Sequence, residues 1–268
     1  MRRFVKNVTA VGFLLLFLPY TITLLLNGKQ GIHREETLSD LEYEVLACMM
    51  AEDYSWMEDG TLDLMAMLHR TACVRGEPAG GESHPVRIYD EKYRRMYEAV
   101  FRTQGQAIAI AGEYRDLPYH EVSAGVTRDG RLLGEEYVYV RAADCSHDRE
   151  SDRYLWCCTL TEEEFAEALG ENCDPDELEY DRDAWEYVTR VEGPGTEWTG
   201  EAFRSLLHLP SSCFFMERTE DGIKVTVKGI GHGFGISLYA ADRMIRDGAD
   251  VSEIIQKFYE GAECITIP

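Results

Sequence analysis

The chain has 268 residues and a formal net charge of −22, with 27 lysine and arginine residues against 49 aspartate and glutamate residues. A surface this acidic repels nucleic acid and anionic lipid headgroups, so the composition argues against proteins that bind polyanions. Hydrophobic residues make up 45% of the chain, and its length suits one large domain or two small ones.

The N-terminus has the pattern of a membrane anchor. Arg2, Arg3 and Lys6 precede a largely apolar run, residues 11–26, that contains no charged residue. With its flanking residues the run reaches the ~20 residues that a helix needs to cross a bilayer, and no small-x-small cleavage site follows it. Because basic residues favour the cytoplasmic side, we expect residues 1–30 to be a cytoplasmic tip and a transmembrane signal anchor.

Residues 31–268 are then expected to form one domain outside the cytoplasm. This part holds 23 of the 27 basic residues and all 49 acidic residues, a net charge of −26. Acidic residues are densest in 145–195, which predicts a peripheral subdomain there. The eight cysteines include no C-x-x-C pair, and isolated histidines such as His120 and His147 are more often not ligands, so no metal and no cofactor is expected.

Hydrophobic periodicity and turn residues predict the secondary structure that follows a polar linker at 28–37. The expected helices span 39–52, 61–74, 91–103, 161–169, 199–207, a segment that ends at Gly248, and 250–261. The expected strands span 107–111, 136–140 and 223–227, and loops are expected at 76–85 and 173–175. Helices and strands without β-α-β regularity predict the α+β class, with a mixed, largely antiparallel sheet and flanking helices. Asp250 and Glu253 form a capping box at the start of the last helix.

Glu52 is a candidate catalytic residue at the end of the first expected helix. On a wheel of ~100° per residue it falls on the same face as Leu41, Val45 and Met49. In a dry site a carboxyl group keeps its proton, as a general acid requires, whereas a carboxylate that reaches beyond the helix end is solvated. The pattern alone leaves both interpretations open.

A glycine-rich loop lies between the strand at 223–227 and the helix after it. Residues 229–237 read GIGHGFGIS, with a glycine at every second position around His232. Glycine permits backbone angles and close approaches that side chains forbid. The spacing fits neither a phosphate-binding loop nor a dinucleotide fingerprint. A tight strand-to-helix corner explains the glycines but not a histidine at their centre.

Several segments together resemble the stage II sporulation protein D and amidase-enhancer family. Residues 229–241 are similar to its signature G-x-G-H-G-x-G-M-S-Q-x-G-A, and Phe-Tyr-Glu-Gly at 258–261 is similar to its Tyr-x-Gly ending. Residues 99–105, 119–127 and 207–212 resemble A-V-x-x-T-x-G, F-x-S-T-S-x-G-x-T and L-x-L-R-S-S in the family's order. The first two expected helices align without a gap with V-x-x-E-M-P…E-A-L-K-A-Q-A-V-A-A-R-T, which places Glu52 on the first glutamate and Arg70-Thr71 on the final pair.

This resemblance implies a lytic transglycosylase that cleaves the glycan strands of peptidoglycan during spore engulfment. Glu52 corresponds to the family's catalytic acid, which protonates the glycosidic oxygen and then, as a base, assists attack by the sugar's own C6 hydroxyl to leave a 1,6-anhydro end. The candidate substrate-binding residues are Arg70, His232, Ser237, Tyr119 and Ser123. We expect the loop 232–237 to line one cleft with Glu52.

Two of these candidates have a structural alternative. Arg70 can bind Glu52 or substrate, or it can form a structural ion pair on a buried helix. Ser237 can bind a sugar hydroxyl, or it can cap the helix that follows it.

The chain also departs from the family motifs. Asp53 and Tyr54 stand in place of the Met-Pro after the glutamate. The other changes, at positions expected to hold sugar, are Asp63 for Lys, Met65 for Gln, Pro210 for Arg, Leu238 for Gln and Ala240 for Gly. They favour a second function, a catalytically weakened glycan-binding protein that stimulates a cell-wall amidase. A wall-associated scaffold of vegetative cells is a third function.

The expected partners follow from the same resemblance. They are peptidoglycan glycan strands, a cell-wall amidase and other engulfment membrane proteins, with no nucleic acid. The expected location is the mother-cell membrane, which the chain crosses once, with the globular domain facing the septal wall.

Overall fold

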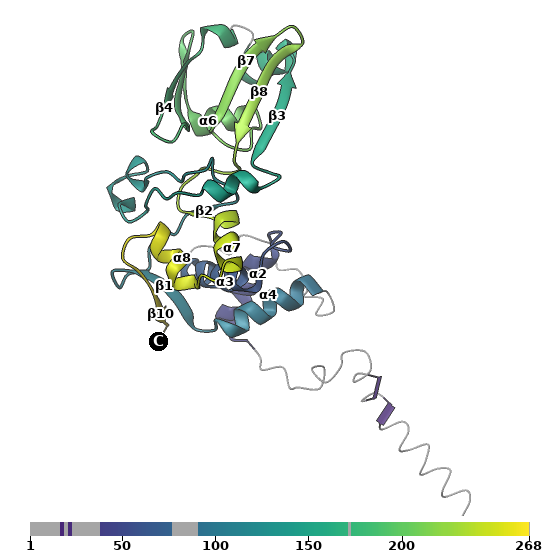
Figure 1. The fold of residues 1–268 in the computed structure, drawn as a ribbon, viewed down its shortest axis with the longest axis vertical. Helices are drawn as coiled ribbons and strands as arrows, with labels where there is room; N and C mark the ends of the chain where they lie inside the picture. The colour runs from purple at the N-terminus through teal and green to yellow at the C-terminus, as the bar shows by residue number, and fades with distance from the viewer. Residues whose placement is uncertain (1–16, 19–20, 23–37, 77–90, 171–172, 268) are drawn as a thin grey trace, which may run out of the picture. The chain divides into compact units, whose positions relative to one another are not determined.

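The computed structural model describes residues 17–18, 21–22, 38–76, 91–170 and 173–267 (Figure 1). Met1–Ser39 and Asp40–Pro268 are two separate compact units. The second unit contains nearly all the described residues, and the fold described below belongs to it.

The predicted anchor falls largely outside the described residues. Residues 17–18 and 21–22 are helical and exposed, and the hydroxyl of Thr21 donates a hydrogen bond to the carbonyl oxygen of Leu18 at 3.0 Å. No helix within the described ranges is long and apolar enough to cross a bilayer. The linker at 28–37 and most of the loop at 76–85 also lie outside the described residues.

The helices of the second unit lie close to their expected positions. They are α2 (Asp40–Met50), α3 (Asp59–Val74), α4 (Glu91–Arg102), α5 (Glu162–Leu169), α6 (Gly200–Leu206), α7 (Leu238–Arg246) and α8 (Val251–Phe258). The predicted capping box of α8 is confirmed, because the Asp250 side chain accepts from the Glu253 backbone N–H and the Glu253 side chain accepts from the Asp250 N–H. Together with the strands, these helices confirm the α+β class.

The described strands form four small sheets, so the expectation of one mixed sheet is wrong. The antiparallel pair is β1 (Gln106–Ile110) with β10 (Ala262–Thr266), and the parallel pair is β2 (Tyr119–His120) with β9 (Ile236–Ser237). One antiparallel triplet has the order β3 (Leu155–Leu160), β8 (Gly222–Lys228), β7 (Phe214–Thr219). The other is β4 (Glu179–Arg182), β5 (Val188–Gly193), β6 (Thr196–Thr199).

The strand predicted at 136–140 is also wrong. The amide of Tyr137 donates to the carbonyl oxygen of Gly134, and the amide of Val140 donates to that of Tyr137, so the chain closes two successive turns there. The alternation of aromatic and branched residues remains, but its side chains pack in a looped segment rather than a ladder.

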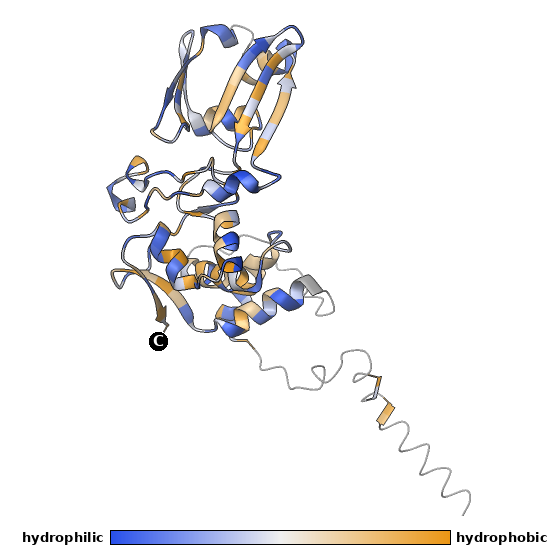
Figure 2. Ribbon diagram, viewed as in Figure 1, coloured by the Kyte–Doolittle hydropathy of each residue, from blue (hydrophilic) through white to orange (hydrophobic). Residues whose placement is uncertain are grey.

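Two hydrophobic cores support the unit. One lies where α3 contacts α2, α4, α7, α8 and β1. The second is built from Phe165, Leu178, Val188, Val191, Phe203, Leu207, Leu209, Phe214, Ile223, Val225 and Val227. Figure 2 shows the alternating hydropathy along β8 that buries its apolar residues in this second core. Because α6, β7 and β8 contribute to it, this core extends past the peripheral subdomain expected at 145–195.

Candidate functional site

The glycine-rich loop 229–237 is shaped by close approach to the segment that contains β2. Gly235 has a φ of 69°, and a Cβ there would lie 1.7 Å from the carbonyl oxygen of Pro118. Gly231 has a φ of 107°, and its Cβ would lie 2.6 Å from the Cβ of His120. The two chains therefore approach more closely than side chains allow, and this explains the glycines.

The histidine at the centre of the loop is half-buried and neutral. The Nδ1 atom of His232 accepts a hydrogen bond from the amide of Phe234 at 3.0 Å, so the proton of the neutral ring lies on Nε2. Burial lowers the pKa of His232. Its ring centroid lies 5.7 Å from that of His120. His232 can thus offer an N–H donor, and its predicted role in substrate binding stays a prediction.

Arg128 fixes the loop from its other side. Its Nε lies 2.6 Å from the carboxylate of Asp183, and both side chains are almost fully buried. Its Nη1 donates to the carbonyl oxygen of His232 at 3.2 Å, and its guanidinium stacks on Phe234 at 4.3 Å. A buried, paired arginine is an anchor for the backbone of the loop rather than a group that waits for a ligand.

Glu52 lies outside the helix on which it was expected. The helix α2 ends at Met50, and Glu52 follows in a bend, with an exposed side chain. The dry-site interpretation is therefore wrong, and the solvated alternative describes the residue. Burial raises the pKa of Tyr119 and of Glu121, and the nearby negative charge of Glu52 raises both further. The carboxylate of Glu52 thus lies close to β2, the strand that pairs with the end of the glycine-rich loop.

Beside Glu52, two tyrosines and a histidine form a hydrogen-bonded cluster. Tyr54 is buried, and its hydroxyl lies 3.1 Å from Nε2 of His69. The hydroxyl groups of Tyr54 and Tyr119 are also hydrogen-bonded to each other. The ring centroid of His69 lies 6.1 Å from each tyrosine ring. This arrangement agrees with a surface role for Tyr119, and it adds two residues that the sequence did not single out.

Signals for the two missed residues were present in the chain. Tyr54 is one of the two departures that follow the motif glutamate, and His69 interrupts a helix whose preceding residues, 64–68, are all buried. Neither signal says that the two side chains meet, because they belong to segments 15 residues apart.

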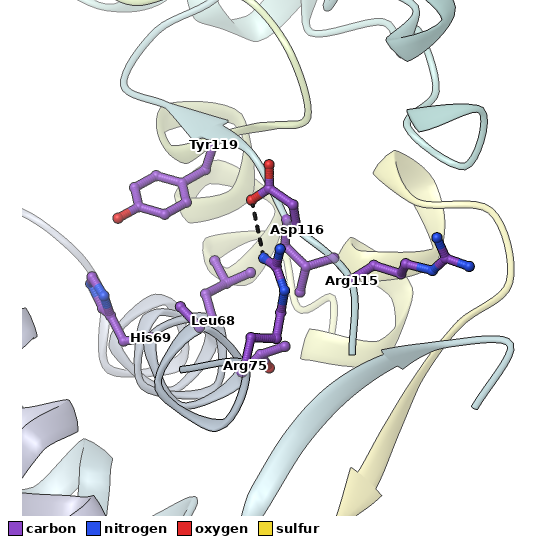
Figure 3. Close-up of a pocket in the computed structure, with 9 residues that line it drawn as sticks. Leu68, His69, Arg75, Arg115, Asp116 and Tyr119 are labelled. Atoms are coloured by element: carbon purple, nitrogen blue, oxygen red, sulfur yellow. Dashed lines mark hydrogen bonds and ion pairs between the residues drawn. The ribbon is translucent and has the colours of Figure 1, made fainter. Parts of the chain in front are cut away.

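A pocket of about 150 Å³ adjoins the cluster (Figure 3). Its lining residues are Leu68, His69, Thr71, Ala72, Arg75, Arg115, Asp116, Leu117 and Tyr119. Figure 3 shows Tyr119 and His69 on one side and the Arg75–Asp116 pair, 3.5 Å apart, on the other. Arg115 extends away from that pair and binds Glu113 at 2.6 Å. The pocket is smaller than the ~300 Å³ at which ligand sites usually begin, so it can admit only part of a sugar.

Arg70 follows the structural alternative. Its side chain is fully buried, and its guanidinium binds both carboxylate oxygens of Glu42, with the shortest contact 2.6 Å. It also donates to the carbonyl oxygens of Gln106 at 2.8 Å and Val100 at 3.2 Å. The prediction that Arg70 binds Glu52 or substrate is therefore wrong.

The two serines are also buried and bound inside the fold. The hydroxyl of Ser237 donates to Asp148 at 2.7 Å and accepts from the amide of Ala240, which caps α7. The amide of Ser123 donates to the same carboxylate oxygen at 2.7 Å, and its hydroxyl accepts from the amide of Gly125. The capping alternative thus describes Ser237, and the prediction that these two hydroxyls bind substrate is wrong because neither reaches the surface.

Comparison with known proteins identifies relatives of the chain. No protein-family model matches it. Over 180 residues, 65% of the chain, it is 27% identical to stage II sporulation protein D of Bacillus subtilis. Over 184 residues it is 26% identical to stage II sporulation protein D of Bacillus amyloliquefaciens. The chain is a divergent member of the stage II sporulation protein D family.

The coverage of these matches is partial. The chain spans about half the length, 52%, of both sporulation proteins. It is also 30% identical to an uncharacterized protein of Brachyspira hyodysenteriae over 81 residues, which are 29% of this chain and 22% of that protein.

Within this family, the departures of the chain have structural explanations. Met65 and Leu238 are buried in the core, so side chains at these positions do not face a ligand here. Asp63 binds Arg102 of α4 at 2.7 Å. Pro210 accepts a hydrogen bond from the amide of Gly231 at 2.8 Å through its carbonyl oxygen. The expectation that these positions hold sugar is wrong for Met65 and Leu238, where the exchange repacks the core.

Proposed function

We propose that the chain is a cell-wall enzyme of sporulation, a lytic transglycosylase that cleaves peptidoglycan glycan strands with Glu52 as its acid and base. The observation that carries the proposal is the position of Glu52 beside Tyr119 of β2. The resemblance places a catalytic carboxyl group at this position, and β2 is the strand that pairs with the end of the signature loop.

An exposed carboxyl group suits a polymeric substrate. A glycan strand lies along a protein surface and has no need of a closed pocket. When it covers Glu52 it removes water from the carboxyl group, which favours the protonated form that acts as general acid. The resulting carboxylate then accepts the proton of the C6 hydroxyl, so one group serves both steps. The pocket next to Tyr119 has room for one substituent of such a sugar.

A second function is favoured by a specific observation. Glu52 is solvated, and the motif positions 65 and 238 are packed in the core instead of facing a ligand. A glycan-binding protein that stimulates a cell-wall amidase needs a surface for glycan but no acid. Replacement of Glu52 by Gln separates the two functions, because a binder would stimulate an amidase equally well with either residue.

The location and partners are part of the same proposal. The basic flank and apolar run at 2–26 support a single N-terminal membrane helix, with the acidic domain outside the mother-cell membrane and facing the septal wall. An amidase and other engulfment membrane proteins are the proposed partners there. Protease added to intact protoplasts should remove the domain, and a domain that stays protected would contradict this location.

The activity is tested on denuded glycan, the strands from which an amidase has removed the peptides. The full chain, purified in detergent, should release fragments with 1,6-anhydro ends, which mass spectrometry identifies by the water they lack. Fragments with ordinary reducing ends would indicate a hydrolase, and intact strands that sediment with the protein would indicate the binder.

A further inference from the structure

The hydroxyl group of Tyr54 has two hydrogen-bond partners and little access to water. Its side chain is 4% exposed, and its hydroxyl lies 3.1 Å from Nε2 of His69 and is hydrogen-bonded to the hydroxyl of Tyr119. A phenol has one proton to donate and can also accept. The two bonds of Tyr54 are therefore coupled, because its proton can go to only one neighbour at a time.

This coupling permits two arrangements of protons. When Nε2 of His69 has no proton, it accepts from Tyr54, and Tyr54 then accepts from Tyr119. The oxygen of Tyr119 is left to accept a hydrogen bond from a ligand. When Nε2 carries a proton, it donates to Tyr54, Tyr54 donates to Tyr119, and the O–H of Tyr119 is left to donate to a ligand. An imidazolium ring permits only the second arrangement.

We propose that Tyr54 and His69 are positioning residues that decide whether the hydroxyl of Tyr119 accepts or donates a hydrogen bond at the glycan-binding surface. The proposal rests on the proposed function for its ligand. The chemical consequence is a choice between groups on a sugar: an accepting Tyr119 suits a sugar hydroxyl, and a donating Tyr119 suits the carbonyl oxygen of an acetamido group.

The surroundings of His69 decide how its charge responds to pH. Tyr54 and Tyr119 face its ring directly, and the pocket that both His69 and Tyr119 line adds an arginine and an aspartate. The ionisable groups on the elements around it are Cys48 of α2, Glu52 and Tyr54 after α2, Cys73 of α3, Arg75, Arg115 and Asp116 after α3 and β1, and Tyr119 of β2. Histidine is the side chain that ordinarily changes charge between about pH 5 and pH 8, so the second arrangement should prevail at the acidic end of that range.

The test compares full-length variants on denuded glycan from pH 5 to pH 8, with kcat, KM and glycan binding measured separately. Tyr54→Phe, Tyr119→Phe and His69→Leu should each raise KM and the dissociation constant by about 3- to 10-fold, as expected for one lost hydrogen bond, with kcat little changed. His69→Gln keeps a polar group within reach of Tyr54, so it should restore KM at neutral pH but remove the pH dependence. Tyr180→Phe and His147→Gln, whose side chains lie outside the cluster, are matched controls and should behave as the parent.

The outcomes separate this proposal from the proposed function. If the parent binds or cleaves glycan and His69→Leu matches it in KM and in pH dependence, the positioning role is refuted and the proposed function stands. A parent that neither binds nor cleaves glycan overturns both. The hydrogen bond itself has a readout without substrate: Tyr54→Phe should shift the nitrogen NMR signal of Nε2 of His69, and an unchanged signal would refute the coupling.

Discussion

Arg70 of α3 and Glu42 of α2 form a buried ion pair, with Nη2 of the arginine 2.6 Å from Oε2 of the glutamate. The same guanidinium binds backbone carbonyl oxygens at Val100 and Gln106. One side chain thus joins α2, α4 and the start of β1 to the helix that carries His69. Glu52 enters the site from the turn that leaves α2, so the pair supports the candidate site from beneath.

Arg70→Met should therefore destabilise the fold strongly. It leaves the carboxylate of Glu42 buried without its cation, which costs about 3–5 kcal/mol of unfolding free energy. Urea unfolding followed by circular dichroism measures the loss. Arg131→Met is the matched control, because its ion pair with Asp129 is exposed and should contribute about 1 kcal/mol or less. Equal midpoints for the two variants would show that the buried pair has no such role.

Gly235→Ala should disrupt the approach of the signature loop to β2. The new Cβ would lie 1.7 Å from the carbonyl oxygen of Pro118, so the backbone must move. Gly248 also has a positive φ, 97°, but no atom lies within 4 Å of its Cβ position. Gly248→Ala should thus cost only the backbone strain of about 1–2 kcal/mol, and Gly235→Ala clearly more. A thermal unfolding experiment in which both variants lose the same stability would contradict this account.

His120 gives the fold a dependence on pH. Burial, and then the neighbouring His232, lower the pKa of His120 to about 3, and its Nδ1 donates to the carbonyl oxygen of Phe234 at 3.0 Å. Because the folded pKa lies below the ordinary value of about 6.5, the unfolded chain takes up the proton first. The stability linked to this group is complete above about pH 6.5 and is lost as the pH falls toward 3.

His120→Asn keeps a donor near Nδ1 and cannot titrate, so it should lose less stability than the parent over that pH interval. Unfolding free energies measured at several pH values give the slope for each protein. His147→Asn, at an exposed histidine, should keep the slope of the parent. A slope unchanged by His120→Asn would mean that another group is responsible.

The sequence predicted the long periodic elements well and the short ones poorly. The helices α3 and α7 are evident because apolar residues recur along them, but β2 and β9 have two residues each and exist only because the two chains meet. Periodicity also placed Glu52 on an apolar face, since the pattern continues past Met50 although the backbone leaves the helix there.

The candidate site shows the same division. Glu52 and Tyr119 were found from motif positions, and the structure brings them close together. The burial of Arg70, Ser123 and Ser237 was not predictable, because the same residue types serve in ligand binding and in the interior. The contact between Tyr54 and His69 depends on how α2 and α3 pack, which no local pattern records.

The central claim is that Glu52 transfers the proton in glycan cleavage, and the release of 1,6-anhydro ends by Glu52→Gln tests it most directly. Glutamine keeps the shape of the side chain and removes the acid, so the rate should fall by about 10²- to 10⁴-fold while glycan binding and the unfolding midpoint stay near those of the parent. Glu44→Gln, at an exposed glutamate of α2, should cleave at the parental rate. If Glu52→Gln released anhydro ends as fast as the parent, Glu52 would not be the acid and the proposed mechanism would be wrong.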